Sequence, residues 1–185
     1  MQTVGMDTYP MAHERTPPVA RPRGARSDLR QQRPFRSIAQ EATLALLKTA
    51  AVVDRSLTRV LAPSGLSHEQ YNVLRILRGA GTPGLPTLEI RRRMIAEGAA
   101  ITRLLDKLER ARFVTRKRPA PDRRQVLCAL TPAGVALLAE LEEPINGTDE
   151  AAMRTLSEAE QRTLTGLLDR VRAAVRSSSA EGSAR

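Results

Sequence analysis

The sequence predicts a mostly α-helical protein with one small β-hairpin. Apolar residues recur at helical spacing in several segments between residues 37 and 176. Between residues 113 and 130 the apolar period changes to two, which is typical of strands. The 185 residues are enough for one domain of ordinary size with tails.

The first long helix is expected over residues 38–62. Ser37 and Gln40 form a capping-box pattern, in which the hydroxyl satisfies one free amide and the glutamine side chain reaches back to another. Residues 63–65, Pro-Ser-Gly, end the helix.

Two further helices are expected before residue 96. Ser67 and Gln70 form a second capping box, and the helix that they open ends in the glycine-rich stretch 79–84. Thr87 is the expected cap of a short helix over 88–95, which carries three consecutive arginines at 91–93.

The clearest amphipathic helix is predicted over residues 98–112. Its apolar residues fall at i, i+3, i+4 and i+7, and they are Ile101, Leu104, Leu105 and Leu108. Its other face is polar and mainly basic, with Thr102, Arg103, Asp106, Lys107 and Arg110. Asp106 and Arg110 have the spacing of a surface ion pair.

A hairpin is expected directly after this helix. Residues 113–118 and 125–130 are the predicted strands, and the turn between them has a basic tip at Arg123 and Arg124. Cys128 alternates with apolar neighbours on the second strand, so we expect a small buried side chain. A redox sensor would need an accessible thiolate.

Two helices are predicted after the hairpin. Thr131 caps the first, with Pro132 at its first helical position, and a bend or break is expected at residues 144–147. Ser157 and Glu160 form a third capping box, which opens a last apolar-striped helix ending near Arg176.

The basic charge of the chain is concentrated in one block. The chain has 30 Lys and Arg against 20 Asp and Glu, a formal charge of +10. Residues 86–130 hold twelve basic and five acidic side chains, whereas residues 131–185 hold six and nine. An acidic partner is therefore expected to meet residues 86–130.

Both ends of the chain are predicted to be disordered. Residues 1–36 hold seven arginines and five prolines with almost no apolar periodicity. They are either an idle tail or a basic arm that lies along nucleic acid. Residues 177–185 are the second predicted tail.

The composition excludes several protein classes. One cysteine and two histidines make neither a disulfide framework nor a zinc cluster. We find no apolar run of the ~18–20 residues that a membrane span needs, and we expect a cytoplasmic protein without cofactor or metal. No catalytic constellation or phosphate-binding loop indicates an enzyme.

A helix, a short helix, a basic amphipathic helix and a hairpin, in this order, are the layout of a winged helix-turn-helix. Such a helix fits the major groove of double-stranded DNA, and a basic hairpin tip beside it reaches phosphates or the minor groove. The coincidence with the basic block predicts a DNA-binding lobe over residues 67–131.

Several motifs resemble the MarR family of bacterial transcription regulators. They are ITRLLDKLE at 101–109, FV at 113–114, PDRR at 121–124, VL at 126–127 and LTPAG at 130–134. The resemblance covers roughly residues 37–176. It implies a homodimer that binds a pseudo-palindromic operator and represses transcription until a small, often phenolic, effector is bound.

The resemblance also assigns residues by position. Recognition helix 98–112 would place Ala99, Thr102 and Arg103 nearest the bases, with Lys107 nearer phosphate. Wing 113–130 would present Arg123 and Arg124, one of them braced by Asp122. Residues 97–100 offer few hydrogen-bonding side chains, which shifts the expected base contacts toward Thr102, Arg103, the wing and DNA shape.

A dimer is also expected from the lengths of the helices. The winged core is too small to bury the apolar stripes of residues 37–62 and 132–176, so these segments are predicted to pack against a second copy. Tyr71 is the aromatic residue expected to line an effector pocket. The alternative hypothesis is a winged-helix adaptor that docks on an acidic protein and binds no specific DNA sequence.

Overall fold

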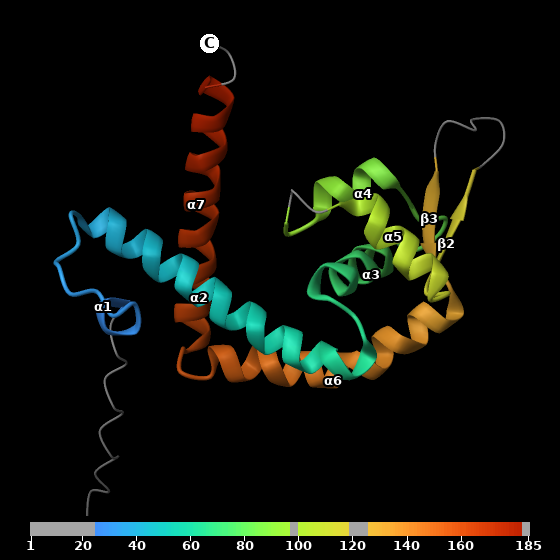
Figure 1. The fold of residues 1–185 in the computed structure, drawn as a ribbon, viewed down its shortest axis with the longest axis horizontal. Helices are drawn as coiled ribbons and strands as arrows, with labels where there is room; N and C mark the ends of the chain where they lie inside the picture. Colours follow the sequence, from blue (N-terminus) through green and yellow to red (C-terminus); the bar gives the residue numbers. More distant parts are fainter. Residues whose placement is uncertain (1–24, 97–99, 119–125, 183–185) are drawn as a thin grey trace, which may run out of the picture. The chain divides into compact units, whose positions relative to one another are not determined.

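A computed structural model of the chain describes residues 25–96, 100–118 and 126–182. Figure 1 shows a largely helical chain with one small sheet. In chain order the elements are α1 (Ala25–Asp28), α2 (Ile38–Leu61), the 3-10 turn η1 (Ala62–Ser64), α3 (His68–Ala80), β1 (Leu85–Pro86), α4 (Thr87–Arg93), α5 (Ile101–Arg110), β2 (Val114–Lys117), β3 (Leu127–Leu130), α6 (Pro132–Met153) and α7 (Glu158–Gly182). The predicted fold class, mostly α with a small hairpin, is confirmed.

The chain divides into two compact units, one through Lys48 and one from Thr49 onward. The first unit contains α1, which lies inside the segment 1–36 that was predicted to be disordered. This prediction is wrong for residues 25–28, which form a single helical turn, and the Arg30 N–H donates to the Ser27 carbonyl directly after it. Such a turn forms locally and needs no apolar core. Residues 1–24 lie outside the described residues.

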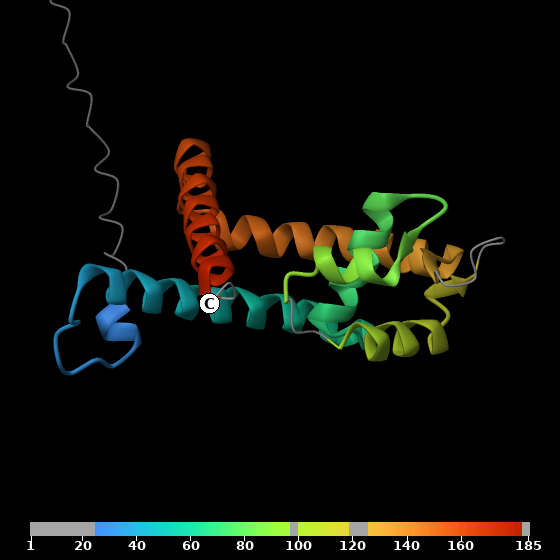
Figure 2. The same ribbon diagram turned by 90° about the horizontal axis from the view of Figure 1, so that it is seen from above.

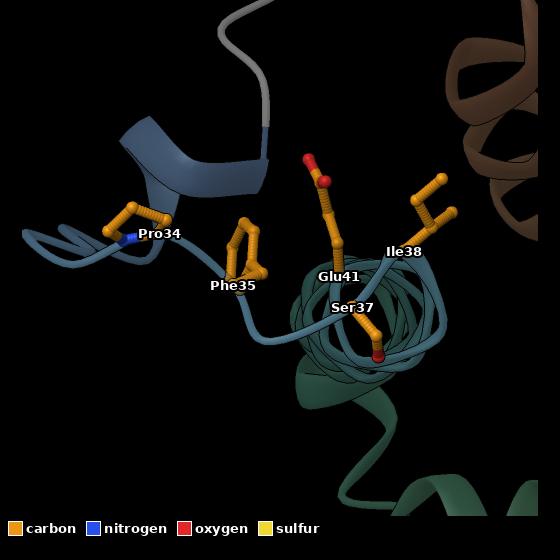
Figure 3. Close-up of a pocket in the computed structure, with 5 residues that line it drawn as sticks. All are labelled: Pro34, Phe35, Ser37, Ile38 and Glu41. Atoms are coloured by element: carbon orange, nitrogen blue, oxygen red, sulfur yellow. The ribbon is translucent and has the colours of Figure 1, made fainter.

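The first unit also holds a small open pocket of about 460 Å³. Its lining residues are Pro34, Phe35, Ser37, Ile38 and Glu41. In Figure 3 the ring of Phe35 and the carboxylate of Glu41 lie on one side of the chain, while the Ser37 hydroxyl points away from them. That hydroxyl accepts the Gln40 backbone N–H, so Ser37 caps α2 as predicted.

Two of the predicted capping boxes form completely. In α3 the Ser67 hydroxyl accepts the Gln70 N–H, and the Gln70 side chain accepts the Ser67 N–H. Ser157 and Glu160 exchange the same pair of bonds at the start of α7. At α2 the second bond differs, because the Gln40 side chain accepts from the backbone of Arg36.

The core of the second unit is built around α3, which packs against α4, α5, α6 and the sheet (Figure 1, Figure 2). Its most deeply buried side chains come from seven elements, and they are Leu61, Val73, Leu74, Leu77, Ile90, Leu105, Leu108, Val114, Cys128 and Leu138. Cys128 is fully buried, as predicted. The helices of the lobe are therefore held by one shared apolar core.

The sheet has three strands rather than the predicted two, in the order β1-β3-β2 and antiparallel throughout. The additional strand β1 has only two residues, too few to show an alternating pattern in the sequence. Gly84 leads into it with φ +102°, and a Cβ at this position would lie 2.2 Å from the Cys128 carbonyl oxygen. Only glycine allows the two chains to approach so closely.

The sequence predicted a bend or a break at residues 144–147, and the break does not occur, because α6 is continuous through Pro144. Leu141 and Ile145 are buried on either side of the proline and continue the stripe that begins at Leu138. Packing on both sides of Pro144 thus offsets the cost of one lost helical hydrogen bond, about 3 kcal/mol or more for an interior proline.

Two further boundaries differ from prediction. α7 continues past Arg176 to Gly182, so residues 177–182 are helical rather than disordered. Seryl hydroxyls at 177 and 178 donate to carbonyls one turn earlier, which continues the helical pattern. Thr87 is not a cap: α4 begins without a side-chain cap, and the Thr87 hydroxyl lies 3.7 Å from the Cys128 sulfur. Within the described residues, none of the helices combines the length and apolar character that crossing a membrane requires.

Candidate nucleic-acid interface

The exposed face of α5 carries the basic residues that the sequence assigned to DNA. Ile101, Leu105 and Leu108 are buried against the core, which turns the opposite side of the helix to solvent. Thr102, Arg103 and Lys107 are all exposed on that side. The described helix is shorter than the predicted 98–112, because Ala100 begins it without a side-chain cap and Ala111 ends it.

Four of the predicted contact residues cannot be placed. Ala99 and the wing residues Asp122, Arg123 and Arg124 lie outside the described residues. The strands that flank the wing tip are described, and they pair in register from Val114 opposite Leu130 to Lys117 opposite Leu127. Lys117 and Arg118 are exposed where β2 ends, so described basic side chains continue from α5 onto the hairpin.

Arg116 of β2 connects the hairpin to α5. Its guanidinium donates to Asp106 Oδ1 at 2.5 Å and to Glu109 Oε2 at 2.6 and 2.9 Å. These hydrogen bonds, led by the one to Glu109, raise the pKa of Arg116 above its ordinary value. The expected Asp106–Arg110 side-chain pair is wrong, since Arg110 Nε donates to the Asp106 backbone carbonyl instead.

Sequence reasoning missed Arg116 because the residue lies on another element. The sequence did contain a signal. Asp106 and Glu109 are three residues apart on the predicted helix, and Arg116 lies on the strand that follows it. Arg116 can pair with both carboxylates only because of the angle between α5 and β2. Spacing along the chain does not reveal that angle.

Asn72 bonds to the residues that follow α4. It is the buried polar residue of the described core, 2% exposed, and its Oδ1 accepts the Ile95 backbone N–H at 3.1 Å. Its amide nitrogen has no partner among the described residues. The bond ties the segment after α4 to α3.

The arginines at 91–93 are all exposed on α4. Arg92 pairs with Glu89 at 2.5 Å on the same helix. For Arg91 and Arg93, no described carboxylate lies within ion-pair distance. Two of the three positive charges on α4 are thus uncompensated within the described chain, which suits contact with phosphate.

Tyr71 is half-buried against the core of α3. Burial raises the pKa of its hydroxyl above the ordinary value, while the charges of Arg78 and Arg75 oppose this shift. The open pocket at residues 34–41 does not include this side chain. The assignment of Tyr71 to an effector pocket stays a prediction.

No group of three or more His, Cys, Asp or Glu side chains in the described ranges is arranged to hold a metal ion. The site therefore consists of a core-held basic helix, a short helix before it, and a hairpin tied to it by Arg116. This arrangement is a winged helix-turn-helix, a class of domain that binds DNA.

Comparison with known proteins assigns the family. The model of the MarR family matches residues 66–126, which run from the start of α3 to the edge of β3. The transcriptional regulator PecS of Dickeya dadantii is 30% identical over 127 residues, covering 68% of this chain and 76% of PecS. The chain belongs to the MarR family of transcriptional regulators.

Solved structures agree with this assignment. A MarR transcription factor from Planctomyces limnophilus is 37% identical, with a TM-score of 0.57 over 74% of this chain and 98% of that one. A cysteine-to-serine mutant of Escherichia coli MarR complexed with operator DNA is 26% identical, with a TM-score of 0.63 over 69% and 90%. The similar proteins are regulators rather than enzymes.

Proposed function

We propose that this protein is a homodimeric repressor that binds a pseudo-palindromic operator through α5 and the wing at residues 113–130. The observation that carries the proposal is the exposed basic face of α5. Thr102, Arg103 and Lys107 project from a helix whose other face is anchored in the core. A helix presented in this way fits the major groove of double-stranded DNA.

Each exposed residue of α5 has a role that follows from its chemistry. Arg103 has the planar donors that pair with guanine in the major groove, and Thr102 suits either base type. Lys107, one turn further along the helix, carries a point charge that suits phosphate. Ala99, Asp122, Arg123 and Arg124 are assigned by family position alone. The E. coli relative solved with operator DNA supports this mode of binding.

The dimer is inferred from apolar surface that the single chain leaves exposed. None of the described side chains of α7 is buried. Three of its apolar side chains are largely exposed, with Leu167 at 50%, Val171 at 47% and Val175 at 61%. The stripe on α2 likewise includes Leu47, 61% exposed. Packing against a second copy buries such stripes and spaces two recognition helices one turn of DNA apart, ~34 Å.

A bound dimer on a promoter excludes RNA polymerase, which is the simplest route to repression. The family resemblance suggests release by a small phenolic effector, and Tyr71 is the residue that we assign to its pocket. If phenolic compounds bind, they should raise the melting temperature of the protein. Loss of this rise in Tyr71→Ala would support the assignment of Tyr71 to the pocket.

The proposal is tested by fluorescence anisotropy on DNA from the protein's own upstream region and on a scrambled duplex. Arg103→Ala is expected to weaken binding to the specific site by about 5- to 150-fold and to the scrambled duplex much less. The matched control is Arg162→Ala, since Arg162 is an exposed arginine of α7 paired with Glu158. It should leave both affinities unchanged.

Two results would contradict the proposal. Equal losses of affinity on both duplexes would remove base recognition by Arg103. Wild-type protein that binds both duplexes equally, or neither, would favour the adaptor hypothesis, in which the winged helix docks on an acidic protein. Sedimentation of the free protein tests the dimer separately.

A further inference from the structure

We propose that Arg116 is a positioning residue for DNA binding, which neutralises the two carboxylates of α5 and holds them away from the phosphates. This inference rests on the proposed function. The recognition helix carries Asp106 and Glu109 among its basic residues, and uncompensated carboxylates at a DNA surface repel the backbone. Arg116 removes this repulsion without itself lying on α5.

The geometry is that of a fork rather than a point contact. Nη2 of Arg116 reaches both carboxylates, at 2.5 Å to Asp106 and 2.6 Å to Glu109, and Nε makes a further bond to Glu109 at 2.9 Å. A lysine ammonium carries no planar, rigid fork that could hold the two groups in this way. The Arg116 side chain is 23% exposed, against 41% for each carboxylate.

The charges left over on α5 are then all positive. Arg103, Lys107 and Arg110 have no ion pair with a described carboxylate, because Asp106 and Glu109 both pair with Arg116. A helix of nearly balanced sequence therefore presents a basic surface. Arg116 of β2 neutralises the two acidic side chains of α5 and leaves its basic side chains unpaired with described carboxylates.

The same contacts join the hairpin to α5. Arg116 lies opposite Cys128 in the sheet register, so its backbone belongs to the hairpin while its side chain bonds to Asp106 and Glu109 of α5.

The test uses the full chain and three variants at Arg116, Asp106 and Glu109. Arg116→Met keeps the apolar stem and removes the charge, and is expected to weaken specific binding about tenfold or more at low salt. Combining it with Asp106→Asn and Glu109→Gln removes all three charges, and is expected to restore binding to within about threefold of wild type. Asp106→Asn with Glu109→Gln, which leaves Arg116 in place, should bind at least as tightly as wild type.

The salt dependence of DNA affinity distinguishes repulsion between carboxylates and phosphates from a loss of protein structure. The ratio of wild-type to Arg116→Met affinity should shrink as salt rises, because released carboxylates are screened. A purely structural defect would keep that ratio constant. The matched control is Arg162→Met, which frees Glu158 on α7 and should leave affinity unchanged.

The outcomes distinguish this inference from the function on which it rests. Wild type that does not discriminate its own upstream DNA from scrambled DNA overturns the proposed function. If the wild type discriminates between the two duplexes while the triple variant binds as weakly as Arg116→Met, the inference is overturned and Arg116 is a direct DNA contact. If Arg116→Met does not fold, weaker binding by the Asp106→Asn, Glu109→Gln variant still overturns it.

Discussion

The hydroxyl of Thr131 donates a 2.6 Å hydrogen bond to the backbone carbonyl of Arg112. Arg112 follows α5 in a left-handed conformation, with φ +62°, which costs a non-glycine residue about 1–2 kcal/mol. The Thr131 N–H also donates to the neighbouring Phe113 carbonyl at 3.0 Å. The start of α6 is thus bonded directly to the end of the recognition helix.

Removing this hydroxyl is expected to destabilise the protein. Thr131 also caps α6 by accepting the Gly134 N–H at 3.1 Å, so Thr131→Val loses two hydrogen bonds. We expect the free energy of unfolding to fall by about 1–3 kcal/mol, measured by urea denaturation. Thr131→Ser retains the hydroxyl and serves as the control. Equal stability of the two variants would show that the hydroxyl contributes nothing.

The two glycines of α6 should respond oppositely to alanine. A Cβ on Gly134 would lie 2.3 Å from the Phe113 carbonyl oxygen, whereas a Cβ on Gly147 meets nothing within 4 Å. Gly147→Ala is expected to stabilise the helix by up to about 1 kcal/mol, and Gly134→Ala to destabilise the protein despite the same helix propensity. Thermal unfolding of both variants makes the comparison. A gain at both positions would refute the close approach at Gly134.

Asn72→Ala is expected to cost about 1–3 kcal/mol, because it leaves the Ile95 N–H without its buried acceptor. Since that bond holds the residues after α4 against α3, specific DNA binding should also weaken at temperatures where the variant is folded. Circular dichroism and anisotropy measure the two effects. The half-buried Gln161, which donates to the Leu156 carbonyl at the start of α7, provides a control as Gln161→Ala. Unchanged stability in Asn72→Ala would mean that water replaces the acceptor.

Cys128 is expected to be unreactive in the folded protein. Burial raises the pKa of its thiol above the ordinary value, an effect that the Thr87 hydrogen bond only partly opposes. Alkylation at pH 8 should therefore be about 100-fold slower in the native than in the urea-unfolded chain. The chain has one cysteine, so mass spectrometry reads this site alone. Comparable rates in both states would refute the burial.

The same shift has a consequence for stability at high pH. A raised folded-state pKa means that the unfolded chain loses the thiol proton first as pH rises. Stability is then fully present below the ordinary thiol pKa and declines above it. Cys128→Ala should remove this part of the decline, as followed by urea unfolding between pH 7 and 10.

Local chemistry determined most of the helix boundaries in advance. Ser67, Thr131 and Ser157 act on backbone amides within three residues, so their roles depend on nothing distant. The face of α5 that carries Thr102 and Arg103 was likewise predictable, because amphipathic spacing decides which side meets a core. For the same reason Cys128 could be predicted to be buried.

The sequence by itself determined the fold class, the basic helix and the hairpin, since each depends on spacing along the chain. Tertiary packing alone decided that α6 continues through Pro144 and that a two-residue strand joins the sheet after Gly84. It also decided that Asp106 pairs with Arg116 and not with Arg110. These features depend on contacts between distant segments, and their energies come from burial and hydrogen-bond geometry that exist only once the core has formed.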